Sequence, residues 1–239
     1  MKVVAAVFAR GGSKGVPDKN LRLLHGRPLV AHAVGQAAAC PGVERVLVST
    51  DSPEIAAAAS AAGAEVPWLR PPELSDDTSR EWDAWQHLLA WLDERGETPD
   101  RLLVVPCTAP LRTVGDLARC VDAAQVPGVD VVITVTPGHR NPWFNMVTVG
   151  HDGAARLVME PRERIHRRQD APPVFDVGTV AFVVDPTYVK SATSLYDGRV
   201  IAVEVPAERS LDIDTETDLA FAEFLIARRR DLGEEPAHG

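Results

Sequence analysis

The sequence predicts an α/β protein whose mostly parallel sheet is covered by helices on both faces. Apolar runs rich in β-branched residues alternate with amphipathic runs along most of the 239 residues, a pattern typical of strands joined by crossover helices. The composition, 45% hydrophobic and 25% charged, is ordinary for a domain with a sizeable core. The stretch from Pro137 to Pro173 breaks the alternation. We therefore expect one Rossmann-like domain over residues 1–239, with an insertion at about 137–173.

The expected strands are short and bounded by turns. The first, Lys2 to Phe8, runs directly into a glycine-rich turn at residues 10–15. The others have the β-branched, apolar composition of strands that are covered on both faces. They are expected at residues 43–49, 102–105, 129–135, 177–184 and 200–205.

The expected helices carry start signals or an apolar face. Ser52 and Pro53 have the residue types of an N-cap and a first helical position, ahead of a helix over residues 54–62. Between residues 80 and 94 the large apolar side chains repeat at helical spacing, so Trp82 and Trp85 are expected in the core rather than against a nucleotide base. Further helices are expected at residues 28–40, 114–124 and 215–230, and the polar tail beyond is expected to fray.

The irregular stretch predicts a projecting hairpin. It contains the prolines Pro142, Pro161, Pro172 and Pro173 after Pro137, the turn Asp152-Gly153 and the basic run from Arg162 to Arg168. A long irregular segment inside a compact domain usually has a binding role. We therefore expect a lid or a dimer contact here, with a solvated basic surface as the simpler interpretation of the arginines.

Charge and hydropathy exclude two classes of partner. The formal net charge of −9 argues against a nucleic-acid binder held by bulk charge. No stretch approaches the ~20 apolar residues of a membrane span, and the amino terminus lacks the features of a signal peptide. The cysteines Cys40, Cys107 and Cys120 fit neither a zinc cluster nor a disulfide framework, so we expect a cytoplasmic protein, with Cys107 and Cys120 as core thiols.

The segment AVFARGGSKGVPDKN, residues 6–20, predicts an anion site at the end of the first strand. Glycines there let the backbone approach a ligand and turn its N–H groups toward an anion. Arg10, Lys14 and Lys19 add positive charge to an otherwise acidic protein. The carboxyl ends of strands in an open α/β sheet are where phosphorylated ligands bind.

Other interpretations of this segment compete. It is not a P-loop, because no Gly-Lys-Ser/Thr follows Gly11 at the required interval. Residues 11–15 match the G-x-S-x-G elbow of hydrolases, but only ten residues precede Gly11, which leaves no room for an upstream oxyanion loop. A glycine turn with incidental surface cations stays open as the structural alternative.

Five motifs in order resemble those of CMP-sugar synthetases, the cytidylyltransferases that activate sialic acid and related 3-deoxy-2-keto sugar acids. They are ARGGSKGVPDKN (9–20), the block at 48–79, TAPLR (108–112), RRQDAPPVFD (167–176) and ERSLDIDTETDLAFAE (208–223). The resemblance implies a nucleotidyltransferase fold, CTP and an anionic sugar as substrates, Mg²⁺ as cofactor, and a homodimer.

The resemblance also implies roles for single residues. Arg10 and Lys19 would bind the triphosphate and, with Asp212, form the catalytic set, while Asp212 and Asp214 would hold Mg²⁺. Arg168, Gln169 and Phe182 would lie on the sugar side. The implied nucleotide-binding residues are Ala9, Arg10, Gly11, Gly12, Ser13, Lys19, Asn20, Arg70 and Ser79.

The motif DID has two carboxylates two positions apart. In an extended segment both point to the same side and can share one hard cation. The alternative is that Asp214 or Thr215 caps the last helix, since both residue types favour that position. The two interpretations are compatible if Asp212 faces the metal.

The sugar half departs from the sialic-acid enzymes. Where those enzymes have the motif Q-P-T-S-P-L-R, this chain has Pro106 in place of the Gln. Where they have N-G-A-x-Y, residues 178–182 of this chain have Gly178 in place of the Asn and Phe182 in place of the Tyr. Because unmatched polar groups cost about 1–3 kcal/mol each, we expect N-acetylneuraminate to be a poor substrate. A transferase using CTP or GTP on a sugar phosphate, cyclitol phosphate or phosphonate stays an alternative, as does a non-catalytic nucleotide-binding module.

Overall fold

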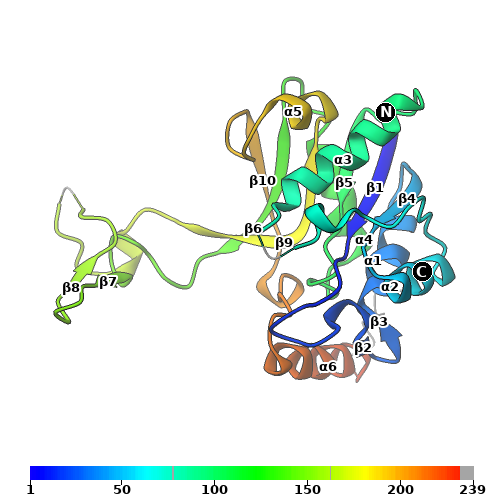
Figure 1. Cartoon of the computed structure of the whole chain (residues 1–239). Helices are drawn as coiled ribbons and strands as arrows, with labels where there is room; N and C mark the ends of the chain where they lie inside the picture. The colour runs from blue at the N-terminus through cyan, green and yellow to red at the C-terminus, as the bar shows by residue number, and fades with distance from the viewer. Residues whose placement is uncertain (77, 162, 232–239) are drawn as a thin grey trace.

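The computed structural model describes residues 1–76, 78–161 and 163–231 and has the expected α/β architecture (Figure 1). Its central sheet has six strands in the order β10-β6-β9-β5-β1-β4. Strand β9 is antiparallel to both of its neighbours, and the other five strands run in one direction. The strands are β1 (Val3–Phe8), β4 (Val43–Ser49), β5 (Arg101–Val104), β6 (Val131–Pro137), β9 (Phe175–Val184) and β10 (Val200–Glu204).

Helices cover both faces of the sheet, and the period of two along β1 assigns its side chains to two cores. Val3, Ala5 and Val7 belong to one buried cluster, whereas Val4 and Ala6 belong to another. The first core is covered by α1 (Leu29–Ala38), α2 (Pro53–Ala61), α4 (Val114–Ala123) and α6 (Glu216–Asp231). The second core is covered by α3 (Glu81–Glu94) and the short α5 (Pro186–Ser191).

The helix starts confirm the predicted signals. The Ser52 side chain accepts a hydrogen bond from the N–H of Ile55, and Pro53 is the first residue of α2. Trp82 and Trp85 are buried in the second core, as their spacing predicted. The expected tail to Gly239 lies outside the described residues.

One short hairpin was not expected. Strand β2 (Leu23–Leu24) pairs with β3 (Arg27–Pro28), so α1 begins one residue later than its pattern suggested. His25 and Gly26 both have positive φ, 51° and 80°, which is the geometry of a tight two-residue hairpin turn. The described residues also form four 3₁₀ turns, η1 (Lys19–Leu21), η2 (Pro72–Leu74), η3 (Arg168–Asp170) and η4 (Ala207–Arg209).

The irregular stretch forms an arm that leaves the body of the molecule. Strands β6 and β9 run out of the sheet as far as the pair Pro137 and Phe175. Beyond them the chain carries the small hairpin of β7 (Val147–Val149) and β8 (Ala155–Leu157), which projects to the left in Figure 1. The predicted projecting hairpin is therefore present. Among the described residues, no helix combines the length and apolar character of a membrane span.

Candidate active site

A pocket of about 620 Å³ opens at the carboxyl ends of β1 and β5. Its walls come from Asp214, in the loop before α6, and from four other segments that are far apart in the sequence. They are the glycine loop after β1, the stretch from residue 70 to residue 81, the loop after β5, and the middle of β9. The predicted site residues that line it are Arg10, Ser13, Lys19, Asn20, Arg70, Ser79, Phe182 and Asp214.

The glycine loop is held open by side chains that bind its backbone. The N–H of Gly11 donates to Oδ1 of Asp51 at 2.9 Å, and Nδ2 of buried Asn20 donates to the carbonyl oxygen of Arg10 at the same distance. Gly12 has a φ of 65°, a left-handed conformation that favours glycine. Asn20 therefore shapes the loop as well as lining the pocket.

Cations concentrate on the loop side of the pocket, where Arg10, Lys14, Lys19 and Arg70 line the wall. Nη1 of Arg10 donates to the carbonyl oxygen of Asp76 at 2.9 Å. Arg70 is only 6% exposed, and burial lowers its pKa while the charges of Asp51 and Glu81 oppose that effect. A pocket with these cations in a protein of net charge −9 is suited to a polyanion.

The two predicted metal carboxylates occupy different environments. Asp214 is exposed, lines the pocket, and accepts a hydrogen bond from Nζ of Lys19 at 2.9 Å. Asp212 is not among the lining residues, and its Oδ1 is buried without a hydrogen-bond partner. Thr215 caps α6, because its Oγ1 accepts from the N–H of Asp218, so neither aspartate is used as the cap.

These carboxylates fit a hard divalent cation only as part of a larger ligand set. An unpartnered buried carboxylate oxygen next to an exposed carboxylate supplies the oxygen donors that Mg²⁺ prefers. In the part of the chain that the structure describes, no three His, Cys, Asp or Glu side chains gather as a metal site. The remaining positions would fall to ligand phosphates and water, which is the usual arrangement for Mg²⁺.

The opposite end of the pocket is built by an irregularity in β9. Ile133 pairs with Phe182 but the next residue, Thr134, pairs with Gly178, so three residues of β9 bulge out of the ladder. Thr179 in the bulge and Phe182, the paired residue that follows the bulge, both line the pocket, and Oγ1 of Thr108 donates to Oγ1 of Thr179 at 3.4 Å. This end is less basic than the loop end.

Some predicted site residues lie elsewhere. Ala9 is buried, Gly12 is exposed, and Gly11 lines a small neighbouring cavity that shares Arg10. Arg168 and Gln169 line a separate cavity at the base of the arm, where Nη2 of Arg168 donates to the carbonyl oxygen of Gly138 at 2.7 Å. Within one chain these two residues do not join the pocket at the glycine loop.

The structure adds residues that the motifs did not assign. Arg112 is fully buried, donates to the carbonyl oxygen of Pro106 at the pocket wall, and has its pKa lowered to about 10 by burial. Glu81 lines the pocket, and desolvation of its carboxyl raises its pKa although part of the residue is exposed. The TAPLR motif marked Arg112 without giving it a role, and no sequence pattern marked Glu81.

Neither Ser13 nor Cys107 has the surroundings of a catalytic nucleophile in this geometry. Among the described residues that line the pocket there is no histidine, so Ser13 lacks the base that a nucleophile elbow requires. Burial raises the pKa of Cys107 to about 12, so its thiol stays protonated at neutral pH. The predicted core-thiol interpretation is confirmed for Cys107 and Cys120, which are free and buried, and Cys40 is free and buried as well.

An open α/β sheet with a basic glycine loop at the end of its first strand defines a nucleotide-binding enzyme. Comparison with known proteins makes the class specific, since the family model described as "Cytidylyltransferase" matches residues 4–125, about half of the chain. The chain belongs to the cytidylyltransferase family, among the nucleotidyltransferases of the CMP-sugar synthetase type.

Three similar proteins cover nearly the whole chain. The CMP-N,N′-diacetyllegionaminic acid synthase of Legionella pneumophila is 31% identical over 229 residues, covering 95% of this chain and 97% of its own length. The protein of the same name from Campylobacter jejuni is 28% identical over 227 residues, with 95% of each chain covered. A solved CMP:2-keto-3-deoxy-manno-octonic acid synthetase complexed with CTP has a TM-score of 0.73 at 18% identity, covering 96% of this chain and 100% of its own. That last likeness shows the fold.

Proposed function

We propose that the protein transfers CMP from CTP to the anomeric hydroxyl of a sialic-acid-like 3-deoxy-2-keto sugar acid and releases pyrophosphate. The observation that carries this proposal is the pocket, whose basic end is lined by Arg10, Lys14, Lys19 and Arg70 and whose other end is formed by the bulge of β9. The names of the relatives, which describe synthases of CMP-activated acidic sugars, support it.

The chemistry needs charge neutralisation and positioning more than covalent catalysis. The oxygen of the sugar hydroxyl bonds to the α-phosphorus and gives up its proton to the solvent, while the bond between the α-phosphorus and the bridging oxygen breaks and pyrophosphate leaves with that electron pair. Arg10, Lys19 and Arg70 would bind the phosphates, while the N–H groups of the glycine loop would orient them. Asp212 and Asp214 would hold Mg²⁺, which when bound neutralises phosphate charge.

The acceptor end of the pocket favours an acid other than N-acetylneuraminate. Pro106 and Phe182 line it, and neither has a side-chain hydrogen-bonding group. A Cβ on Gly178 would come within 2.4 Å of Oγ of Ser210, so a larger residue fits there only if Ser210 moves. We propose a legionaminic-type acid as the preferred acceptor, in agreement with the relatives' names.

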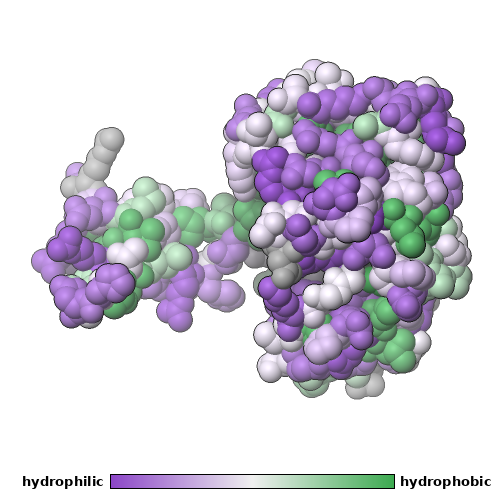
Figure 2. Space-filling view, in the orientation of Figure 1, coloured by the Kyte–Doolittle hydropathy of each residue, from purple (hydrophilic) through white to green (hydrophobic). Residues whose placement is uncertain are grey.

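We propose that the working unit is a homodimer in which the arm reaches the partner's pocket. Arg168 and Gln169 sit at the base of the arm, away from the pocket of their own chain. Figure 2 shows hydrophobic residues gathered on the arm, and its exposed apolar side chains include Met146, Val147, Val149, Val158 and Met159. A second copy would cover them and bring the two polar residues to a sugar. The three buried free cysteines support a cytoplasmic location as part of this proposal.

The test is pyrophosphate release with CTP, Mg²⁺ and a panel of acceptors. The panel contains N,N′-diacetyllegionaminate, N-acetylneuraminate, 2-keto-3-deoxy-manno-octonate, a cyclitol phosphate and a phosphonate, with GTP replacing CTP in parallel. We expect legionaminate to exceed N-acetylneuraminate in kcat/KM by ten- to a few-hundredfold, because each lost contact is worth roughly a factor of ten. Turnover confined to the cyclitol phosphate and the phosphonate, or absent with all five acceptors, would refute the proposal.

A further inference from the structure

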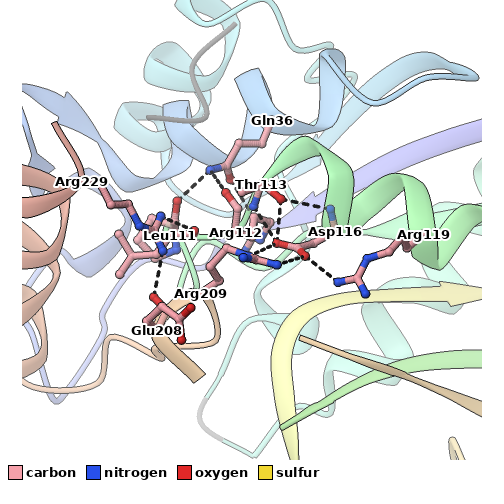
Figure 3. Close-up of polar contacts among 10 residues, drawn as sticks. Gln36, Leu111, Arg112, Thr113, Asp116, Arg119, Glu208, Arg209 and Arg229 are labelled. Atoms are coloured by element: carbon pink, nitrogen blue, oxygen red, sulfur yellow. Dashed lines mark hydrogen bonds and ion pairs between the residues drawn. The ribbon is translucent and has the colours of Figure 1, made fainter. Parts of the chain in front are cut away.

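One buried carboxylate joins helix α4 to the loop that carries Asp212 and Asp214 (Figure 3). Asp116 is 1% exposed and lies in the first turn of α4. Arg209 donates two hydrogen bonds to this carboxylate in a bidentate pair, from Nε to Oδ2 at 2.9 Å and from Nη2 to Oδ1 at 3.0 Å. A two-pronged pair fixes direction as well as distance. Because Arg209 precedes Asp212 by only three residues, this contact limits where residues 212–214, here called the acidic segment, can lie.

Three further hydrogen bonds connect the same loop, directly or through α6, to the segment that follows β5. Arg229 of α6 donates to the carbonyl oxygens of Leu111, at 2.9 Å, and Glu208, at 3.1 Å. The N–H of Ile213 donates to the carbonyl oxygen of Thr108, which lines the pocket, at 2.8 Å. Residues 207–214 are therefore fastened at both ends to the segment that follows β5.

We infer that the Asp116–Arg209 ion pair positions the acidic segment at the pocket, which makes both residues positioning residues for the proposed transfer. Neither lines the pocket, so their effect passes through the loop. The inference rests on the proposed function for its metal-binding consequence, whereas the anchoring of residues 207–214 is independent of it.

The chain supplies a matched control for this inference. Arg119 also binds Asp116, with Nη2 at 2.8 Å from Oδ1, but it belongs to α4 itself and lies three residues further along the same helix. Arg209→Gln and Arg119→Gln each remove one cation from the same carboxylate. Only the first removes the connection to the acidic segment.

Two measurements separate the variants. Mn²⁺ binding in the presence of CTP, followed by electron paramagnetic resonance, reports on the carboxylates, and amide hydrogen exchange reports on residues 207–214. We expect Arg209→Gln to weaken Mn²⁺ binding at least tenfold and to speed exchange across 207–214, with metal-free CTP affinity changed less than twofold. Arg119→Gln is expected to stay within twofold of the wild type in each measurement. Arg209→Lys keeps the charge but loses the bidentate contact, so its Mn²⁺ affinity and exchange rates are expected to lie between those of the two glutamine variants. It replaces Arg209→Gln if that variant does not fold.

The outcomes distinguish the inference from the function on which it rests. If the Arg209 and Arg119 variants behave alike in metal binding and in exchange, the anchor is refuted. If the wild-type protein turns over none of the acceptors, the proposed function fails, and hydrogen exchange still decides whether Arg209 holds the loop. Faster exchange without weaker Mn²⁺ binding would refute the positioning role.

Discussion

Gly15 lies where the glycine loop passes the acidic segment, and one added carbon tests how closely the two must fit. A Cβ on Gly15 would stand 2.2 Å from the carbonyl oxygen of Asp214, whereas real Cβ atoms essentially never come within 3.0 Å of such an atom. In Gly15→Ala the two backbones must therefore separate by about 0.8 Å. No side-chain rotation relieves the contact, because the obstructing atom belongs to the backbone.

This displacement is expected to reduce catalysis more than folding. The Lys19–Asp214 contact of 2.9 Å spans the same junction, and both side chains line the pocket. A misplacement of about 1 Å in a reacting array can reduce the rate ~100-fold, so we expect kcat/KM to fall by about that factor. Overpacking at a single site costs roughly 1–3 kcal/mol, which leaves a domain of this size folded.

Gly115→Ala is the matched control. Its Cβ meets no atom closer than Oγ1 of Thr113 at 3.7 Å, an ordinary contact, and it lies in the first turn of α4. The control is expected to keep wild-type kcat/KM in a pyrophosphate-release assay and to gain up to ~1 kcal/mol of stability. Values of kcat/KM within threefold of each other for the two alanine variants would refute the close fit at Gly15.

Four further outcomes test the site. Lys19→Ala is expected to weaken CTP binding ten- to a hundredfold in calorimetric titration, because a charge-assisted contact is worth roughly 1.5–3 kcal/mol. Asp214→Asn is expected to lower turnover at least a hundredfold with the melting temperature unchanged, and wild-type turnover would remove the metal assignment. Burial alone would raise the pKa of Asp116, but hydrogen bonds from Arg209, from the N–H of Thr113 and from Arg119 lower it to about 2. The ionised Asp116 therefore stabilises the folded protein fully above pH ~4, and this contribution is lost as pH falls toward 2. Asp116→Asn should accordingly lose about 2 kcal/mol at pH 7 and show a flatter acid limb in urea unfolding. Phe182→Tyr should raise kcat/KM for N-acetylneuraminate relative to legionaminate by about tenfold, and an unchanged ratio would exclude Phe182 from acceptor selection.

The local features of the fold were predictable because each depends on neighbours in the sequence. The glycine loop follows its strand directly, Ser52 caps α2 by accepting a hydrogen bond from the N–H three residues further on, and the tryptophans of α3 repeat at helical spacing. The physical cause of each, backbone freedom, capping or amphipathicity, acts over a few residues. The same holds for the projecting arm, whose prolines interrupt the regular pattern where the arm begins.

The other features depend on partners far along the chain. Asp116 is separated by 93 residues from Arg209, and Gln36 by 76 residues from Arg112. Nothing within a helix period indicates such a pair, so an isolated buried acid or base in the sequence carries no sign of its partner. The antiparallel direction of β9 and its bulge are likewise set by pairing with β5 and β6, not by its own composition.

One end of the pocket is built from neighbours in the sequence and the other from distant segments. This difference explains why the sequence indicated a nucleotide more firmly than an acceptor. The end that we propose for the phosphates is formed mostly by residues 10–20, one contiguous segment whose glycines and cations can be recognised together. The end that we propose for the acceptor combines Pro106 and Thr108 after β5 with Thr179 and Phe182 at the bulge of β9. A substitution in either segment changes which polar groups face the acceptor while leaving the glycine loop intact. Under the proposed function, acceptor choice can therefore vary while the proposed phosphate site stays constant, and predicting the acceptor requires the three-dimensional arrangement of these four residues.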